Sequence, residues 1–163
     1  MSIPEGKLYG GGMLSPGRIA EHHPAEYTLT RVAEGDIKFG YAVVKGTGDL
    51  DVRVPAAANS QFVGVARWST EASDFNNESY KAKDPVGVFS TGVPVVCVEE
   101  EVKIGDPVRV RLVANGEKIA GRFCKTREAG RTAVINNAEW HSASKDGVAH
   151  LYINGPFTTT MDT

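Results

Sequence analysis

Histidines and carboxylates, the side chains that bind metal ions and transfer protons, gather at one place in the sequence, Glu21-His22-His23-Pro24-Ala25-Glu26. Metal binding needs several such groups to converge on one point. Adjacent residues of an extended chain point to opposite sides, so His22 and His23 are poorly placed to share an ion. No third His or Cys stands at ligand spacing. We expect a surface or interface pair here and no metal site.

Two further histidines lie close to aromatic residues. His141 follows Trp140, and His150 precedes Tyr152 by two positions, in a run that alternates between apolar and polar residues. Residues two apart in a strand share a face. We therefore expect both histidines to pack against aromatic rings on the faces of strands.

The acidic clusters are also poorly spaced for general acid-base catalysis. Glu99-Glu100-Glu101 alternate between the two faces of an extended chain, so they cannot work as a pair. We expect a solvated strand end or an edge charge that discourages aggregation. Asp49 and Asp51 share a face but flank a glycine-rich turn without a partner histidine, which favours a solvated hairpin.

Motifs for cofactors and nucleophiles are missing. Gly10-Gly11-Gly12 is not followed by Gly-Lys-Ser/Thr, so the sequence has no phosphate loop, and it has no dinucleotide fingerprint. G-x-S-x-G, H-E-x-x-H and C-x-x-C are also absent. Cys97 and Cys124 each lie in an alternating apolar run, so we expect two reduced, half-buried thiols. The sequence predicts no enzyme, no cofactor and no catalytic residue.

Composition limits the classes of partner that the protein is expected to bind. The 163 residues suit one domain with a core, and the formal net charge of −2 provides no basic field for nucleic acid. No apolar run approaches the roughly 20 residues that span a bilayer, and the N-terminus lacks a signal-peptide pattern. We expect a soluble protein, made in the cytoplasm of its host, that binds neither nucleic acid nor membrane.

Alternation with period two predicts an all-β chain with little helix. Glycine and proline interrupt every stretch long enough for a helical period, whereas about nine short runs alternate as strands do. Asn115-Gly116 and Asp146-Gly147 are the strongest hairpin signals, and Ser90-Thr91-Gly92 also indicates a turn. We expect an antiparallel sandwich or small barrel. The strand runs lie at 37–43, 50–54, 62–68, 86–88, 93–98, 108–113, 119–124, 133–140 and 148–153.

Two segments depart from this pattern. The polar stretch Ser69–Asp84 predicts a long surface loop or one short helix beginning near Ser73. Residues 1–25 are rich in glycine and proline, and their apolar residues follow no period. We expect an extended N-terminal arm over residues 1–25 and a single β-rich domain over residues 26–163.

Several motifs, in order, resemble those of bacteriophage structural cement proteins, which decorate capsids. Phe62-Val63-Gly64-Val65-Ala66 is similar to the family's F-x-G-V-A strand, and Val102–Val108 to its V-x-x-G-D-x-V turn. The resemblance covers Gly17 to Ile153 and departs in the tail, residues 122–163, and in the glycine-rich arm. The family pattern I-x-F-G-x-A-V-x-x-G is filled by Ile37, Phe39, Gly40, Ala42, Val43 and Gly46.

The resemblance implies a β-rich subunit, expected as a homotrimer, that binds the major capsid protein on the outer surface of the virion and bridges capsomers. Apolar side chains of the arm and of the long loop are the expected capsid contacts. These are Ile3, Leu8, Tyr9, Met13 and Leu14 in the arm, and Trp68, Phe75 and Tyr80 in the loop.

Two other functions remain open. A head fibre base or a tail protein would share the β pattern but should show fibre repeats or a coiled coil. A β-barrel enzyme or small-ligand binder should show histidines that alternate on one strand, or an aspartate-bearing uridine loop. The sequence shows none of these features.

Overall fold

The computed structural model describes residues 15–163, and these residues form fourteen strands and one short 3-10 helix, η1 (Phe75–Asn77). The predicted all-β class is confirmed. Many of the strands are too short to show a period in the sequence. Their bounds are β1 Ile19–Glu21, β2 Tyr27–Ala33, β3 Ile37–Lys38, β4 Ala42–Lys45, β5 Asp51–Arg53, β6 Phe62–Ala66, β7 Ser79–Tyr80, β8 Pro85–Cys97, β9 Arg109–Arg111, β10 Phe123–Cys124, β11 Thr132–Ile135, β12 Ala138–Trp140, β13 Val148–Asn154 and β14 Thr159–Met161.

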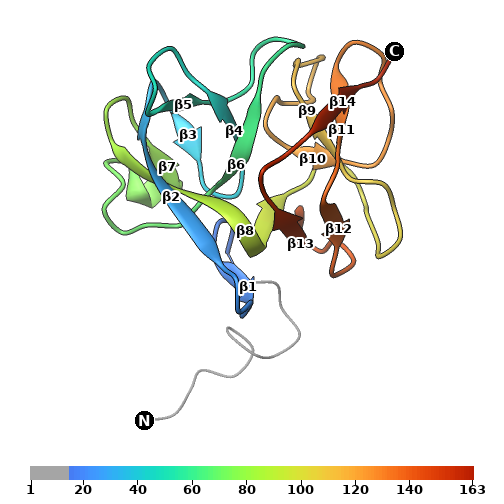
Figure 1. Cartoon of the computed structure of the whole chain (residues 1–163), viewed down its shortest axis with the longest axis horizontal. Helices are drawn as coiled ribbons and strands as arrows, with labels where there is room; N and C mark the ends of the chain where they lie inside the picture. Colours follow the sequence, from blue (N-terminus) through green and yellow to red (C-terminus); the bar gives the residue numbers. More distant parts are fainter. Residues whose placement is uncertain (1–14) are drawn as a thin grey trace.

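Five strands close into a small barrel that forms the first lobe (Figure 1). Their order around the ring is β8-β2-β5-β4-β6, and β6 pairs again with β8. Closure pairs both edges of each strand in the ring, so no edge of the ring is free to recruit another chain. All neighbours in this ring are antiparallel except β2 and β5, which run parallel with Ala33 opposite Val52.

The long strand β8 joins the two lobes. Its first part pairs with β2 and β6, and its second part pairs with β13 and β1. The turn predicted at Ser90-Thr91-Gly92 is wrong, because the ladder continues through this point: Thr91 lies opposite Tyr27 of β2 and Asn154 of β13. Gly92 adopts φ 142°, a conformation open to glycine, so the strand bends without reversing.

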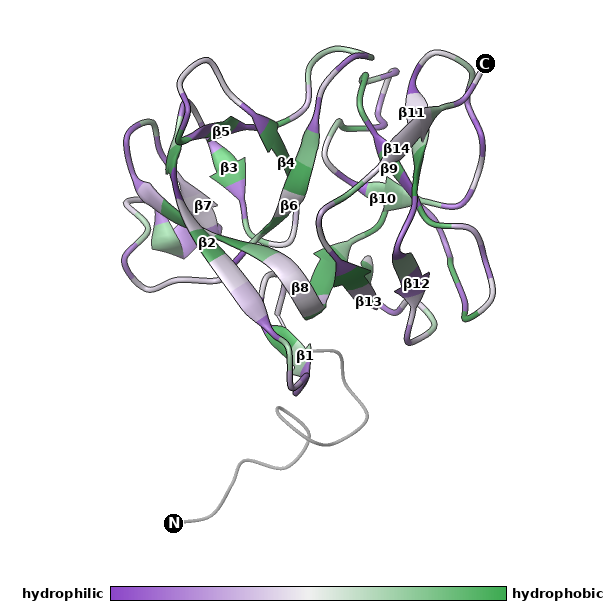
Figure 2. Cartoon of the chain, in the orientation of Figure 1, coloured by the Kyte–Doolittle hydropathy of each residue, from purple (hydrophilic) through white to green (hydrophobic). Residues whose placement is uncertain are grey.

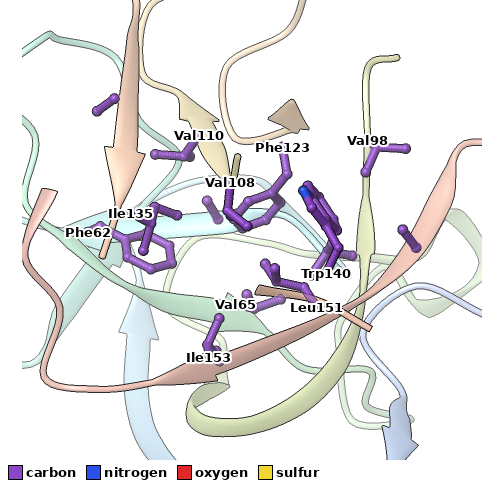
Figure 3. Close-up of a cluster of buried hydrophobic side chains, with 14 of the residues drawn as sticks. Phe62, Val65, Val98, Val108, Val110, Phe123, Ile135, Trp140, Leu151 and Ile153 are labelled. Carbon is purple, nitrogen blue, oxygen red and sulfur yellow. The ribbon is translucent and has the colours of Figure 1, made fainter. Parts of the chain in front are cut away.

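The second lobe is a four-stranded sheet with the order β10-β9-β11-β14, beside the hairpin β12–β13. The larger core lies between this sheet and the barrel and includes Phe62, Phe123, Trp140 and Leu151 (Figure 3). A second cluster, around Phe39, Tyr80 and Val88, lies in the barrel lobe.

Strands β4, β6 and β8 contribute to both cores, so both of their faces are buried. In β4, Val44 packs in the larger cluster while its neighbour Val43 packs in the cluster of the barrel lobe. Figure 2 accordingly shows hydrophobic residues concentrated on β4 and β6. Strands buried on both faces can carry apolar residues at consecutive positions.

Both predicted hairpins form, one of them with different central residues. Asp146 and Gly147 have φ 54° and 78°, as a type I′ turn requires, between Lys145 and Val148. The other turn lies between Asn115 and Lys118, so its central residues are Gly116 and Glu117. Gly116 comes first with φ 59°, which is typical of type II′. No helix among residues 15–163 is long and apolar enough to cross a membrane.

Candidate interaction surface

Residues 17–21 attach the N-terminal segment to the body. The amide of Gly17 donates to the carbonyl of Val95 at 2.8 Å, and the amide of Val95 donates to the carbonyl of Arg18 at 2.8 Å. The amide of Trp68 donates to the carbonyl of Gly17 at 2.8 Å. The segment expected as the end of an extended arm is therefore clamped between β8 and the chain that follows β6, and it continues as β1 along β8.

This clamp requires glycine at position 17. Gly17 has φ +79°, and a Cβ atom there would lie 2.5 Å from the backbone nitrogen of Trp68. Any other residue would have to adopt a strained backbone and push the chain apart. The close approach fixes the backbone of residue 17 against the chain that follows β6.

An aromatic cluster stands beside the clamp. The Cζ atom of Arg18 lies 3.9 Å from the centroid of the Trp68 ring, within cation-π distance. The Phe75 ring meets Trp68 edge-on with 5.5 Å between centroids, and it lies 6.3 Å from the buried ring of Phe39. Phe75 remains 38% exposed, so the cluster presents apolar surface to solvent.

The Arg18–Trp68 groove is an open hollow of about 490 Å³ beside this cluster. It is lined by residues 17–19 and 67–71. This volume lies within the range of about 300–1,000 Å³ that is usual for binding clefts. The groove therefore has space for side chains of a partner, next to an exposed aromatic ring.

The predicted contact residues fall into three groups. Trp68 and Phe75 touch one another in the aromatic cluster. Tyr80 is fully buried in β7, where it lies opposite Ile37 of β3, and its hydroxyl donates to the carbonyl of Arg67. Burial raises the pKa of Tyr80 to about 12. The side chain of Tyr80 is thus part of the core. The remaining predictions, Ile3, Leu8, Tyr9, Met13 and Leu14, lie outside the described residues.

A histidine cluster links β1 to the hairpin β12–β13. The Nδ1 atom of His141 lies 2.6 Å from Glu21 of β1, and its Nε2 atom lies 3.2 Å from Glu139. The ring stacks on Tyr152 at 5.4 Å with an interplanar angle of 11°, and His23 packs against the same tyrosine at 5.5 Å. The predicted packing of His141 against an aromatic ring is confirmed, whereas its pairing with Glu21, 120 residues away in the sequence, left no local signal.

The two carboxylates, Glu21 and Glu139, stabilise the charged form of His141. Burial lowers the pKa of this imidazole, but the contacts with Glu21 and Glu139 outweigh burial and raise the pKa above its usual value. His150 differs, because burial lowers its pKa and its Nε2 atom is buried without a hydrogen-bond partner among residues 15–163. The cluster therefore favours a charged His141 and a neutral His150.

Glu99 and Glu100 are bound within the fold, so the expectation of a solvated strand end was wrong for these two residues, whereas Glu101 is exposed. The side chain of Glu99 is 5% exposed and holds the buried Arg111 at 2.7 and 2.8 Å. Glu100 accepts from the backbone of Lys125 and from the backbone and hydroxyl of Thr126 at 2.7–2.8 Å. Their partners lie 12 to 26 residues further along the chain, where the local pattern cannot reveal them.

Three potential metal ligands lie within 4.8 Å of one another among residues 15–163, on Glu99, Glu100 and Cys124. Both carboxylates already accept hydrogen bonds, Glu99 from Arg111 and Glu100 from Thr126, and burial raises the pKa of the Cys124 thiol. Metal binding needs a thiolate, so this environment is unsuited to an ion. Cys97 and Cys124 are both free thiols, and burial raises the pKa of Cys97 to about 12. Within the described residues, neither this cluster nor the two thiols has the features of a metal centre or a reactive cysteine.

Comparison with known proteins places the chain in a family. Residues 9–154 match the model of the structural cement protein family (E217 gp24/Pam3 gp6). A search of curated proteins finds no match. Among solved structures, a chain of the capsid of Myoviridae phage XM1 superposes with a TM-score of 0.71 at 16% identity, over 94% of this chain and 98% of that chain.

The N base of the head fibre gp8.5 of bacteriophage phi29 gives a TM-score of 0.45 at 14% identity, over 79% of this chain and 94% of that chain. The phage XM1 chain shows that the fold occurs in a phage capsid. The family match spans most of the sequence, including both lobes. The chain therefore belongs to the family of phage structural cement proteins.

Proposed function

We propose that this cement protein binds the outer surface of an assembled phage shell as a homotrimer and bridges neighbouring capsomers of the major capsid protein. The family match over residues 9–154 is the observation that carries the proposal. A threefold subunit arrangement suits positions where three capsomers meet, because closed symmetric assemblies repeat the same contact on every subunit. In this role the protein has no catalytic activity and acts only by contact.

The proposed contacts are the N-terminal arm and the aromatic cluster. The arm, residues 1–25 in our proposal, supplies Ile3, Leu8, Tyr9, Met13 and Leu14 as anchors. The body supplies Trp68 and Phe75, which lie beside the point where residues 17–18 are hydrogen-bonded to the body. Large aromatic side chains that lose their water on binding contribute much of the energy of a protein interface.

In this proposal the body is a rigid link between such contacts. Its barrel is closed, and in the second lobe the buried ion pair between Arg111 and Glu99 and the pair between Arg109 and Asp162 tie distant segments together. An ordered body loses little conformational entropy on binding, whereas each residue that orders on binding costs about 1–2 kcal/mol. We therefore propose that the body positions the arm and that many copies together stiffen the shell.

Co-sedimentation with closed, undecorated shells of the parent phage tests this function. Protein added from outside reaches only the outer surface of a closed shell, so binding reports directly on that face. We expect saturation at a fixed number of copies per capsomer, and sedimentation velocity should show a trimer. Failure to pellet with the shells at any protein concentration would contradict the proposal.

Truncation of the arm tests where the contact lies. Because residues 17–21 are hydrogen-bonded to the body, the deletion should end at residue 14. We expect the shortened protein to keep the circular dichroism spectrum and melting temperature of the full chain and to lose shell binding. If it binds shells as tightly as the full chain, the arm does not contribute the anchors.

A further inference from the structure

We infer that the β1–β2 link, residues 21–26, is held against the hairpin β12–β13 by the charged form of His141 and is released when this imidazole loses its proton. The inference goes beyond the proposed function, because it describes a pH-sensitive device in the free protein. It is carried by one imidazole whose two nitrogens face carboxylates on two different strands.

Both ring nitrogens of His141 face hydrogen-bond acceptors. The Nδ1 atom lies 2.6 Å from a carboxylate oxygen of Glu21, the last residue of β1, and the Nε2 atom lies 3.2 Å from a carboxylate oxygen of Glu139 in β12. A neutral imidazole has one N–H and can donate to only one of them, whereas the charged ring donates to both. Once the proton is lost, one carboxylate faces the lone pair of a ring nitrogen. The arrangement therefore suits only the charged ring.

The other ionisable side chains around His141 leave it as the one charged imidazole of the cluster. Burial lowers the pKa of His150 in β13 and so favours its neutral form. The Nδ1 atom of His23 accepts the amide N–H of Ala25 at 3.1 Å, so this atom carries no proton. Tyr152 of β13 stacks on His141 with 5.4 Å between ring centroids. A single ring therefore supplies the charge that pairs with the two carboxylates.

The link has few other attachments to the body. Ile19 of β1 lies opposite Pro94 of β8 in an irregular ladder, and proline has no N–H to donate. After Glu21 the next residue paired with β8 is Tyr27, so the link itself leaves the edge of this strand. Among residues 15–163, hydrogen bonds, ion pairs and ring contacts join side chains of the link to other elements at two places. These are the pair of Glu21 with His141 and the packing of His23 on Tyr152, with 5.5 Å between centroids.

The charge of His141 therefore governs how firmly the link is held. Burial disfavours this charge, but the two carboxylates outweigh burial and raise the pKa of the ring above its usual value. Such a contact stabilises the folded arrangement fully below the unfolded pKa of histidine, and its contribution is lost as the pH rises through the folded pKa. The link should be held at mildly acidic pH and released at alkaline pH.

Nuclear magnetic resonance of the full chain tests the release directly. Nuclear Overhauser contacts between the rings of His23 and Tyr152 report whether the link lies on the hairpin. We expect these contacts to weaken between about pH 6 and about pH 9, in step with the titration of the ring signals of His141 and not with those of His23. In H141Q the contacts should be weak at every pH. The matched control is H22Q, which should behave as the unmodified protein, because His22 is exposed and makes no hydrogen bond, ion pair or ring contact within residues 15–163.

A cycle of E21Q, H141Q and the double variant measures the coupling across the contact. At about pH 6 the unfolding constant of the double variant should be about 3- to 5-fold smaller than the product of the two separate effects predicts, as for other partly exposed pairs. The coupling should be smaller at about pH 9, where His141 is neutral. E21Q should also lower the pH at which His141 titrates, because it removes the carboxylate at Nδ1. A purely structural role for either side chain would leave this titration unmoved.

The outcomes decide the inference without using shells, so they are independent of the proposed function. Loss of the contacts between His23 and Tyr152 in step with His141, with an unchanged circular dichroism spectrum and a coupling that falls with pH, supports the inference. If these contacts persist while His141 titrates, or if the coupling is as large at about pH 9 as at about pH 6, the charge of His141 does not hold the link and the inference is overturned.

Discussion

Removal of the buried Arg111 guanidinium should destabilise the second lobe strongly. Its side chain is 1% exposed and holds the side chain of Glu99, which is 5% exposed, through two hydrogen bonds of 2.7 and 2.8 Å. A third contact reaches Glu128 at 2.8 Å. Arg111→Met keeps the length of the side chain but leaves the Glu99 carboxylate buried without its partner. Breaking a buried pair in this way costs about 3–5 kcal/mol.

The size of this effect makes it easy to measure. For a chain of this length each kcal/mol lowers the melting temperature by about 2–4 °C, so calorimetry should record a fall of about 6–20 °C. The double variant E99M/R111M should recover at least half of the loss, because it removes both charges and replaces them with apolar volume. Glu128 can do without Arg111, since it is partly exposed and also contacts Lys118.

An exposed arginine provides the comparison. Arg53 is 48% exposed in a loose pair with Glu34 at 3.9 Å, so Arg53→Met should change the free energy of unfolding by no more than about 1 kcal/mol. If Arg111→Met costs as little as Arg53→Met, or if E99M/R111M is no more stable than Arg111→Met alone, the reasoning about desolvation at this pair is refuted.

Two further changes test the barrel and the histidine cluster. Gly64→Ala should lower the free energy of unfolding by about 1–3 kcal/mol in chemical denaturation, because the new Cβ would lie 2.0 Å from the carbonyl oxygen of Phe89. The control Gly35→Ala, whose Cβ would meet nothing within 4 Å, should lower it by less than about 1 kcal/mol. Equal losses would argue against the tight β6–β8 contact. Glu21 stabilises the charged ring of His141 and so raises its pKa in the folded protein. The resulting stability is fully present below the unfolded pKa of histidine and is lost as the pH rises through the folded pKa. His141→Gln should remove this contribution. The gap in melting temperature between variant and unmodified protein should therefore narrow from pH 5.5 to pH 9, and a gap that widens would contradict the assigned protonation.

Local sequence signals predicted the elements that depend on local chemistry. The hairpin at Asp146-Gly147 formed because the turn itself needs residues that tolerate positive φ. The run 93–98 was placed correctly as a strand, but its union with 86–88 across Ser90-Thr91-Gly92 was not predicted. That union depends on β2 and β13, which lie elsewhere in the sequence and pair through this point.

The site was predicted less completely, for a related reason. Trp68 and Phe75 stood out as aromatic residues in a polar loop, and the structure brings them together. Tyr80 looked equivalent, yet β7 pairs it with β3 and buries it. The stacking of Arg18 on Trp68 gave no local signal, because it depends on the hydrogen bonds of Gly17 that bring these two distant segments together.

The melting temperature of the shell itself tests the central claim most directly. Undecorated shells would be heated in a calorimeter with increasing amounts of the protein. A cement that binds the assembled shell in preference to dissociated subunits must stabilise the shell by mass action. We predict that the shell's melting temperature rises with added protein and levels off at the ratio where co-sedimentation saturates. A melting temperature that stays unchanged at saturating protein would contradict the account.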